Sequence, residues 1–541
     1  MKKKLIFGAI AISMLALFGA CGKTTEVQEK PQIQEEQKVT PAEENKNEEK
    51  PNNNKVEKNN WWEAEATPNP EKTQGEIIKP EDETQPETNV EADSIYAKLD
   101  VPTSRKFTTY VFSITGDPAD LTLKPDGIFY GENYELRGRE SEKPIHLDVW
   151  NPDGELILSQ NCGIRIYGAY SRRNFLKSIK LYARESYDPE NKTFKYNFFD
   201  KIKLDGTDKV MKKYKKLVLR NSGNDYQFAW IRDELNQTLA KDAGFEIYES
   251  VAPAIYYING EYKGFYWLHE SYDDKYFKEL YGEEGKEGEF VVCEGGEQEK
   301  KEDDEDELTV KAAKEYNKAY TEFSKMDLTV DANYQKLNSF MDVENYLKYM
   351  AYNIYLCNKD WPDNNYKCFR YYAPAGEAYD AEGVYDGRWR FLLHDMDYTM
   401  GLYGHTECMA NYDNLGDLMS PTTKDENEKV IDNKRYAPLL TALLQREDCK
   451  QFFVDFSLKL AEETLSKSHI AKVLEEMNDE RLEEIDEFYN YLAVLRAKGD
   501  GDIWVWREQF DNATKDIGQW AKQRANYSKR YMEKDLGVTI E

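Results

Sequence analysis

Two short stretches carry side chains whose types and spacing suit chemistry on phosphates. Residues 358–365 read N-K-D-W-P-D-N-N, with Asp360 followed five positions later by Asn365. Residues 394–401 read H-D-M-D-Y-T-M-G, with Asp395 and Asp397 just after an apolar run. Carboxylate and amide oxygens are the ligands that Mg²⁺ prefers, and a positioned carboxylate can accept a hydroxyl proton. The alternative is two ordinary turns, because Asp and Asn are common turn residues.

The order of these residues is the order found in protein kinases. There an Asp accepts the substrate proton, while an Asn five positions later and an Asp after a strand hold Mg²⁺ on the nucleotide. By this order Asp360 is the base, and Asn365, Asp395 and Asp397 are metal ligands. Alternation points Asp395 and Asp397 to the same side of an extended segment. We favour Asp397 because it lies closer to the turn at 398–401.

The elements before these loops are mostly strands. Alternating apolar residues predict strands at 108–114, 144–150, 155–158, 217–220, 251–258 and 264–268. The last two flank Asn259-Gly260, a strong hairpin signal. Apolar residues at helical spacing predict one inserted helix over 228–243. Glu270 closes the hairpin and is grouped with the predicted nucleotide-binding residues.

A further hairpin is predicted at 163–173 and 177–181, and it could cover phosphates. It lacks the sequence G-x-G-x-x-G, so Ser171, Arg172 and Arg173 would supply the phosphate donors. Lys177 or Lys180, on the second strand, would be the lysine that pairs with the phosphates. The alternative is a surface hairpin with solvated arginines.

The second half of the chain has helical patterns. Asp342 is a good N-cap for a helix at 343–356, which delivers the chain to the Asp360 loop. Further helices are predicted at 436–446, 449–466, 468–492 and 507–536, with breaks indicated at 477–479 and 498–501. The predicted fold class is α+β, with a β-rich first lobe and a mostly helical second lobe.

The N-terminus is typical of an exported protein. Residues 1–21 have a basic start, an apolar run of fourteen and small residues before Cys21, as in a bacterial lipoprotein signal. We expect an extracytoplasmic protein anchored to the membrane by a lipid on Cys21; the alternative is an ordinary cleaved signal. Residues 22–93 are polar and Pro-rich, which predicts a disordered tether.

Composition excludes some partners and leaves several sites open. The net charge of −29 argues against a nucleic-acid partner.

Cys357 and Cys368 flank the Asp360 loop and are candidates for a disulfide, with buried thiols as the alternative. His405 and Cys408 have the spacing of zinc ligands, but no second pair follows. The acidic run at 301–307 is simplest as a solvated loop, and its spacing does not match a calcium-binding loop.

Taken in order, these motifs resemble those of the CotH kinase family, named after spore-coat protein H. The resemblance covers roughly 105–540 and rests on the following segments: G-x-x-S-R-R…K-S-x-K-L, L-R-N-S-G-N-D at 219–225, Arg232-Asp233, Y-I-N-G-E-Y-K-G-F-Y-W-L-H-E at 257–270, and the two loops. It implies an atypical two-lobed protein kinase fold that uses ATP with Mg²⁺ or Mn²⁺ to phosphorylate Ser on proteins. One departure is His394, where the family often has Trp or Pro.

The resulting domain prediction is a signal at 1–21, a tether at 22–93, a β-rich lobe at 94–300 and a helical lobe at 301–541. Two functions remain open: a Ser/Thr kinase for surface or spore-coat-type proteins, and an inactive kinase-like lipoprotein that binds a partner. A glycosidase suggested by Trp504, Trp506 and Trp520 has less support, because these residues suit helix packing. The sequence leaves the oligomeric state open.

Overall fold

The computed structural model describes residues 95, 99, 105–130, 133–282, 286–294, 307–425, 427–498 and 507–540. The predicted signal at 1–21 and the predicted tether at 22–93 lie outside the described residues, as does the acidic run up to residue 306. Within the described ranges, no helix combines the length and the apolar composition that a membrane crossing requires.

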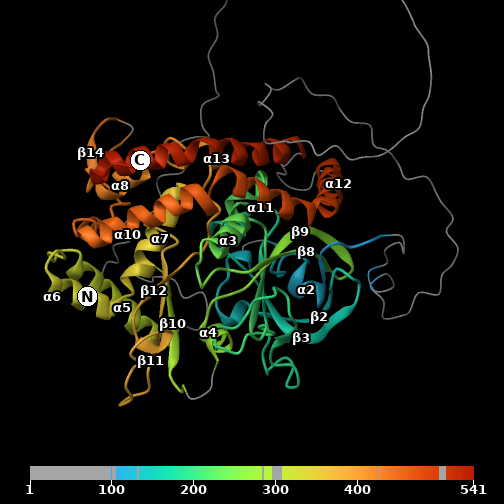
Figure 1. Cartoon of the computed structure of the whole chain (residues 1–541). Coiled ribbons are helices and arrows are strands. Elements are labelled where there is room, and N and C mark those ends of the chain that lie inside the picture. The colour runs from blue at the N-terminus through green and yellow to red at the C-terminus, as the bar shows by residue number, and fades with distance from the viewer. Residues whose placement is uncertain are drawn as a thin grey trace, which may run out of the picture. The chain divides into compact units, whose positions relative to one another are not determined.

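A closed β-barrel forms the first part of the fold (Figure 1). Its strands follow the order β1-β2-β3-β4-β7-β9-β8. Their bounds are β1 Tyr110–Thr115, β2 Lys143–Trp150, β3 Leu156–Ile166, β4 Ile179–Tyr182, β7 Lys216–Arg220, β8 Val251–Ile258 and β9 Glu261–His269. β1 pairs antiparallel with β2 and parallel with β8, which closes the barrel. Ile164, Leu181 and Leu217 are register partners on three neighbouring strands and are fully buried in the core.

The predicted strands are therefore present, with two differences. The segments predicted as a strand at 155–158 and a second strand from residue 163 form one continuous strand, β3. The closure of the sheet into a barrel has no counterpart in the sequence patterns. The predicted helix is shorter than expected: α3 spans Arg232–Asp242. The barrel is followed by a second helix, α4, at Asp274–Tyr281.

A separate three-stranded sheet has the order β10-β11-β12. β10 spans Glu289–Glu294, β11 Lys367–Tyr372 and β12 Arg390–Leu392, and both pairings are antiparallel. β10 precedes residue 300 yet pairs with a strand from the second half of the chain. Short strand pairs, β5–β6 (Phe194–Lys195 and Lys213–Tyr214) and β13–β14 (Thr422–Lys424 and Val430–Asp432), complete the strands in the described ranges.

Helices make up most of the second half. Their bounds are α5 Glu307–Phe323, α6 Asp331–Phe340, α7 Val343–Leu356, α8 Asn414–Met419, α9 Pro438–Leu443, α10 Glu447–Lys459, α11 Lys467–Asp479, α12 Leu482–Lys498 and α13 Arg507–Leu536. Asp342 caps α7 as predicted, since its side chain accepts a hydrogen bond from the Asn345 amide at 3.0 Å. The helix predicted over 468–492 is instead two helices, α11 and α12, which divide after Asp479, just beyond the break predicted at 477–479.

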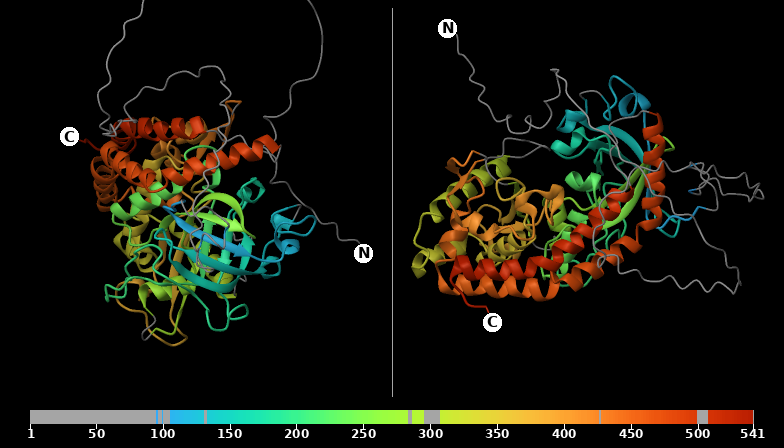
Figure 2. Two further views of the ribbon diagram at one scale, coloured as in Figure 1. Left: turned by 90° about the vertical axis from the view of Figure 1, so that its right-hand side faces the viewer. Right: turned by 90° about the horizontal axis from the view of Figure 1, so that it is seen from above.

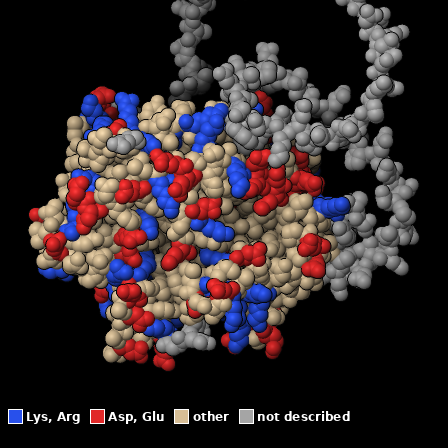
Figure 3. All heavy atoms as spheres, in the orientation of Figure 1, with Lys and Arg blue, Asp and Glu red and all other residues tan. Residues whose placement is uncertain are grey.

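The helices and the barrel lie side by side (Figure 2), and α12 packs against β9 of the barrel. A mixed fold of strands followed by helices is thereby confirmed. Figure 3 shows basic and acidic side chains interspersed over the face in view, with acidic side chains gathered over α12.

The six described cysteines are buried, and none is in a disulfide. The suggested bridge between Cys357 and Cys368 is absent from the structure, where both residues are buried thiols. The Cys357 thiol instead donates to the Met409 carbonyl at 3.4 Å. The Cys408 thiol donates to a carbonyl too, and among the described residues it belongs to no group of metal-ligating side chains. Trp520 is buried and donates to the Cys408 carbonyl, as expected for helix packing.

Candidate active site

The Asp360 loop begins where α7 ends. Cys357, the residue after the helix, adopts a left-handed conformation with φ of 55° and turns the chain out of the helix. The Asn358 amide then donates back to Asn353 Oδ1 at 2.9 Å. Trp361 is 1% exposed, and its indole N–H donates to the Tyr349 hydroxyl at 2.8 Å. These contacts fix the backbone on both sides of Asp360.

Two arginines bind the carbonyl groups around this loop. Arg435 donates to the carbonyls of Asn358 and Trp361 at 2.9 and 3.1 Å, and its own charge is paired with Asp417 at 2.7 Å. Arg524, from α13, donates to the Ile354 and Tyr355 carbonyls at the end of α7. Charged donors make strong hydrogen bonds to carbonyls that a helix end leaves unpaired.

Asp360 projects from this supported loop. Its carboxylate accepts hydrogen bonds from the Asn364 and Asn365 side-chain amides, each at 3.1 Å. Burial, with the nearby Asp395 charge, raises the pKa of Asp360 to about 6. A carboxylate with a pKa near neutrality is ionised at pH 7 and is a better proton acceptor than an ordinary aspartate.

The two loops lie together because the strands beside them pair. β11 begins two residues after Asn365 and β12 ends two residues before His394, and Lys367 lies opposite Leu392 in the register of these strands. Direct contacts complete the junction, since the Lys359 amide donates to the Tyr398 carbonyl at 3.0 Å. The structure thus brings together the two motifs that the sequence singled out.

One guanidinium organises the second loop. Arg220, at the end of β7, contacts Asp395 with Nη2, and the same nitrogen donates to Asp397 at 2.9 Å. Its Nε lies 3.2 Å from Asp233, the second residue of α3. The Arg220 side chain is only 9% exposed. Three carboxylates therefore share one buried positive charge.

Asp395 and Asp397 occupy different environments. Asp397 is 1% exposed and also accepts from the backbone and side-chain amides of Asn224 at 2.8 and 3.1 Å. Gly223 makes this approach possible, because its φ is 54° and a Cβ there would lie 2.0 Å from the Asp397 carboxylate. The Asp395 side chain is 27% exposed. Asp395 is the carboxylate of this pair that has solvent access.

The pKa values of Asp397 and Asp395 also shift in opposite directions, because the two carboxyl groups have different neighbours. Burial and the neighbouring Asp395 raise the pKa of Asp397 well above its ordinary value. Burial would also raise the pKa of Asp395, but the Arg220 guanidinium and the His394 side chain hold it below its ordinary value. Asp395 is therefore the ionised and accessible member of the pair.

A chain of alternating acids and histidines runs from the barrel to this loop. Glu234 contacts His269 at 3.0 Å, His269 contacts Glu249 at 3.1 Å, and Glu249 contacts His394 at 2.6 Å. Burial lowers the pKa of His269, but the hydrogen bonds that its ring donates to both glutamates outweigh burial and raise the pKa to about 9. His269 is therefore an imidazolium that links two buried glutamates.

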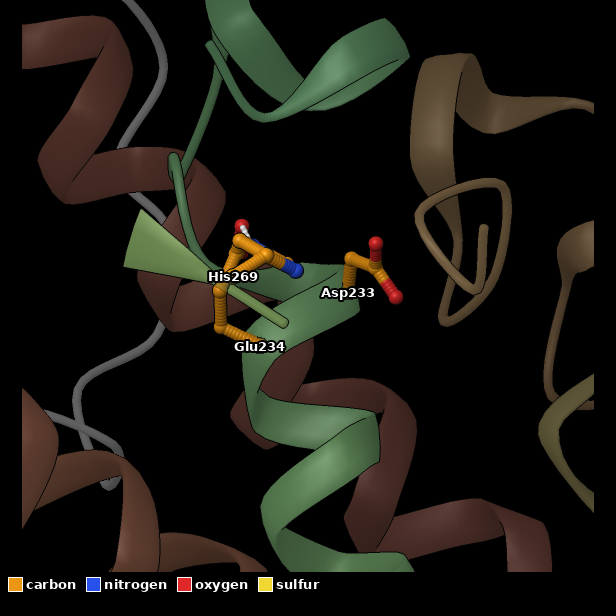
Figure 4. Close-up of side chains that lie close together, drawn as sticks. All are labelled: Asp233, Glu234 and His269. Carbon is orange, nitrogen blue, oxygen red and sulfur yellow. Dashed lines mark hydrogen bonds and ion pairs between the residues drawn. The ribbon is translucent and has the colours of Figure 1, made fainter. Parts of the chain in front are cut away.

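Asp233, Glu234 and His269 also form the one group of described side chains whose ligand atoms lie close enough for a metal, within 4.8 Å of one another. Figure 4 shows the Asp233 carboxylate pointing away from the His269 ring. Both ring nitrogens already contact glutamates, and Asp233 accepts from the Met396 amide at 2.9 Å. We describe this group as a buried ion-pair cluster.

Several residues predicted to bind nucleotide contact other parts of the protein. Arg172 is buried and donates to the Tyr134 and Leu136 carbonyls at 2.9 and 3.2 Å. Lys177 donates to two carbonyls at 2.6 and 3.0 Å, and burial lowers its pKa to about 8.

The other predicted nucleotide-binding residues are spread over the barrel and its loops. Arg173 pairs with Glu135 at 2.8 Å on the surface, and Ser171 lies in the same helical turn. Glu270 pairs with the buried Lys201 at 2.6 Å.

Lys180 is the predicted lysine that shares a barrel face with Arg220. It lies opposite Val218 in the register of β4 and β7. Val218 and Arg220 are two positions apart on β7, so they point to the same face. Lys180 is 9% exposed. The structure thus separates Lys180, on the same barrel face as Arg220, from Lys177, which contacts backbone carbonyls.

Sequence reasoning assigned no role to Arg220, Asn224 or Asp233. All three lie in segments that carried the family resemblance, at 219–225 and 232–233. The available signal was a charged residue at the end of the apolar strand L-V-L-R. A charge at that position needs a buried partner, and only the fold reveals that two of its partners, Asp395 and Asp397, lie more than 170 residues away.

The sequence of this chain matches the model of a known protein family. The family model described as CotH kinase protein matches residues 164–528, well over half of the chain. The match begins within β3 and extends into α13, so it includes Arg220, both loops and Arg524. No curated protein matches the chain. The chain, with its barrel strands, its two acidic loops and the helices that support them, therefore belongs to the CotH kinase family.

Proposed function

We propose that this protein is a CotH-like protein kinase, which transfers the γ-phosphoryl group of ATP to Ser or Thr of a protein substrate. The observation that carries the proposal is the junction of Asp360 with Asp395. It combines a carboxylate whose pKa is raised to about 6 with an ionised, accessible carboxylate on a neighbouring loop. Phosphoryl transfer needs such positioning and charge neutralisation more than covalent catalysis.

The donor set fits a hard divalent cation. Asp395 offers an accessible carboxylate, and Asn365 offers an amide oxygen while its nitrogen donates to Asp360. Oxygen ligands of this kind suit Mg²⁺ or Mn²⁺. When bound, the cation and ATP would supply the phosphoryl group and neutralise its charge. Asp397 would act through Arg220 and Asn224, by fixing the loop that presents Asp395.

The residues of the chain would then divide the work. Asp360 accepts the proton of the acceptor hydroxyl. Asn365 orients Asp360 through the 3.1 Å hydrogen bond, and its side-chain oxygen would be available to hold the cation. Lys180, on the same face of the barrel as Arg220, would contribute positive charge for the phosphates, while Arg220 holds Asp395 and Asp397 in place. A kinase-like arrangement of two lobes, in which the barrel would supply Lys180 and the helical part would supply Asp360 and Asn365, is the architecture that we propose.

The direct test is phosphorylation by the purified full-length chain. The protein is incubated with labelled ATP and Mg²⁺ or Mn²⁺, alone and with surface or spore-coat-type proteins, and the modified residues are identified by mass spectrometry. Asp360→Asn should abolish labelling, and Asp363→Asn, an exposed position of the same loop, should not. Equal labelling by the wild type and Asp360→Asn would refute the proposed role.

A second candidate is a kinase-like protein that binds a partner without phosphoryl transfer. One observation favours it: Arg220 already pairs with both Asp395 and Asp397, so the acidic groups are neutralised without a cation. A thermal shift with ATP that depends on Mg²⁺, followed by transfer in the labelling assay, supports the kinase. No shift and no transfer with either cation supports the binding protein.

We further propose that the protein is an extracytoplasmic lipoprotein, anchored by a lipid on Cys21. The basis is the basic start, the apolar run of fourteen and the small residues before Cys21. Metabolic labelling with a fatty-acid analogue should mark the wild type and not Cys21→Ser. Labelling of both to the same extent would contradict the anchor.

A further inference from the structure

Two of the buried cysteines face each other across a pair of strands. Cys293 lies on β10 and Cys368 on β11, and they are register partners in the antiparallel ladder. Their exposed fractions are 3% and 1%. Partners directly opposite in such a ladder point their side chains to the same face of the sheet. The two thiols therefore lie together on one buried face.

The backbone spacing of such a pair suits a disulfide. Opposite residues in antiparallel strands have Cα atoms roughly 4.5 to 5.5 Å apart, and disulfides span Cα separations of about 4.4 to 6.8 Å. Both kinds of antiparallel pair fall within this Cα range. Opposite Cβ atoms lie about 4.5–5.5 Å apart and a disulfide needs about 3.5–4.5 Å, so closure requires side-chain rotation and a small approach of the two strands. The Cys293 side chain also helps to raise the pKa of the Cys368 thiol, after burial as the main cause, which agrees with their proximity.

The other four described cysteines lie outside this ladder. Cys357 and Cys408 donate to the carbonyls of Met409 and Tyr398, and Cys162 and Cys449 lie on β3 and α10. Among the described cysteines, a shared strand register singles out one pair.

We infer that Cys293 and Cys368 are a disulfide-forming pair that links β10 to β11 beside the active loops. One thiolate attacks a disulfide donor, such as oxidised glutathione or a thiol–disulfide oxidoreductase, and displaces one donor thiol. The second thiolate then attacks the mixed disulfide and displaces the other. The protein gains one S–S bond, the donor gains two electrons, and the two protons from the cysteines end on the donor thiols.

The position of the link gives it a consequence for the site. Cys368 lies three residues after Asn365, and the next register pair toward the loop is Glu294 with Lys367, whose side chains pair at 3.5 Å. The disulfide would tie the end of β10 to the strand that leaves the Asn365 loop. Buried thiols with raised pKa exchange slowly, so closure belongs to folding, before the sheet packs.

The test is disulfide mapping on the full chain carrying Cys21→Ser. The protein is refolded in a glutathione redox buffer, trapped with acid and alkylating agent, and digested without reduction. We expect a Cys293–Cys368 linked peptide and alkylated Cys162, Cys357, Cys408 and Cys449. Refolded protein in which Cys293 and Cys368 are both alkylated, or in which Cys368 is linked to Cys357, overturns the inference.

A second measurement uses the wild type, so it remains informative even if one of the variants does not fold. Reduction of the linked wild type should lower its midpoint of thermal unfolding by about a few degrees, because the link closes a long loop in the unfolded chain. Cys368→Ala should remove this sensitivity to reductant, and the matched control Cys162→Ala should retain it. Equal sensitivity in both variants would assign the effect to another pair. None of these readouts requires kinase activity.

Discussion

The loop of Asp360 and the loop of Asp395 and Asp397 meet in one site, but different interactions hold them. The first is fixed through its backbone, because Arg435 binds the carbonyls on either side of Asp360. The second is fixed through its carboxylates, which share the buried Arg220. Backbone support leaves the Asp360 carboxylate available for chemistry. In the second loop, Asp395 and Asp397 are themselves the side chains that hold the loop in place, so a change in either one also changes the structure of the loop.

Because the two loops are held differently, substitutions in them should affect different properties of the protein. In the first loop a catalytic side chain can be changed without loss of folding, and the supporting arginine can be changed without touching the catalytic group. In the second loop structure and ligand binding are coupled through one guanidinium. The predictions below test this separation, from the largest expected effect to the smallest.

Asp360→Asn should give the largest loss. We expect the transfer rate to fall by about 10²–10⁴, the usual contribution of a positioned base, with little change in binding of ATP with Mg²⁺ or in thermal stability. Single-turnover transfer and calorimetric titration measure the two parts. Loss of nucleotide binding in this variant would show that Asp360 is itself a ligand and would break the comparison.

Asp395→Ala and Asp397→Ala should separate within the second loop. Asp395→Ala should weaken Mg²⁺-dependent binding of a non-hydrolysable ATP analogue by about 10²-fold, because the cation loses its accessible carboxylate. Asp397→Ala should lower the free energy of unfolding by about 2–4 kcal/mol, because Arg220 and Asn224 lose a buried partner. Calorimetric titration and denaturant unfolding test both. The reverse pattern would restore Asp397, which the turn at 398–401 had favoured, as the main ligand.

Arg435→Lys should affect the first loop only indirectly. A lysine cannot reproduce the fork that binds the Asn358 and Trp361 carbonyls, so Asp360 should be misplaced. We expect kcat to fall about 10- to 100-fold with a smaller change in KM for ATP. The exposed neighbour in Lys434→Ala is the matched control. An Arg435→Lys variant with unchanged kcat and lowered stability would reduce Arg435 to a purely structural residue.

His269 should give the smallest effect on activity and a measurable effect on stability. Its pKa is raised from about 6.5 to about 9 in the folded state, so its contribution is complete below pH 6.5 and is lost as pH rises through 9. The full contribution is about 3 kcal/mol, of which about 2 kcal/mol disappears between pH 6 and 8. Denaturant unfolding across this range should show the decline in the wild type, and His269→Gln should flatten it. A parallel decline in the variant would assign the pH dependence to other groups.

The sequence predicted the elements best where the signals were local. Asp342 as the cap of α7 and the turn at Asn259-Gly260 depend on neighbouring residues, and both are confirmed. The break between α11 and α12 lies just beyond its predicted position at 477–479. Barrel closure depends on β1 pairing with β8, strands more than a hundred residues apart. No local pattern encodes such a pairing, because its free energy comes from contacts between distant segments.

The site followed the same rule. Asp360, Asn365, Asp395 and Asp397 were found because their spacing within short loops carries information. Arg220 was missed because its function depends on where β7 ends relative to a loop far along the chain. Lys177 and Lys180 could not be told apart by composition, because only the structure shows that Lys180 lies on β4 in register with β7, whereas Lys177 precedes the strand and contacts the turn before it.

The support of α7 by Arg524 also has a consequence for the order of synthesis. Arg524 binds the Ile354 carbonyl across 170 residues of chain. At about 5–20 residues per second, the ribosome adds this arginine some 10–30 s after the helix it completes. A nascent or truncated chain therefore carries every loop residue of the site yet lacks the side chain that holds the end of α7. The end of α7, and with it the start of the Asp360 loop, therefore gains its support only in a chain that extends into α13.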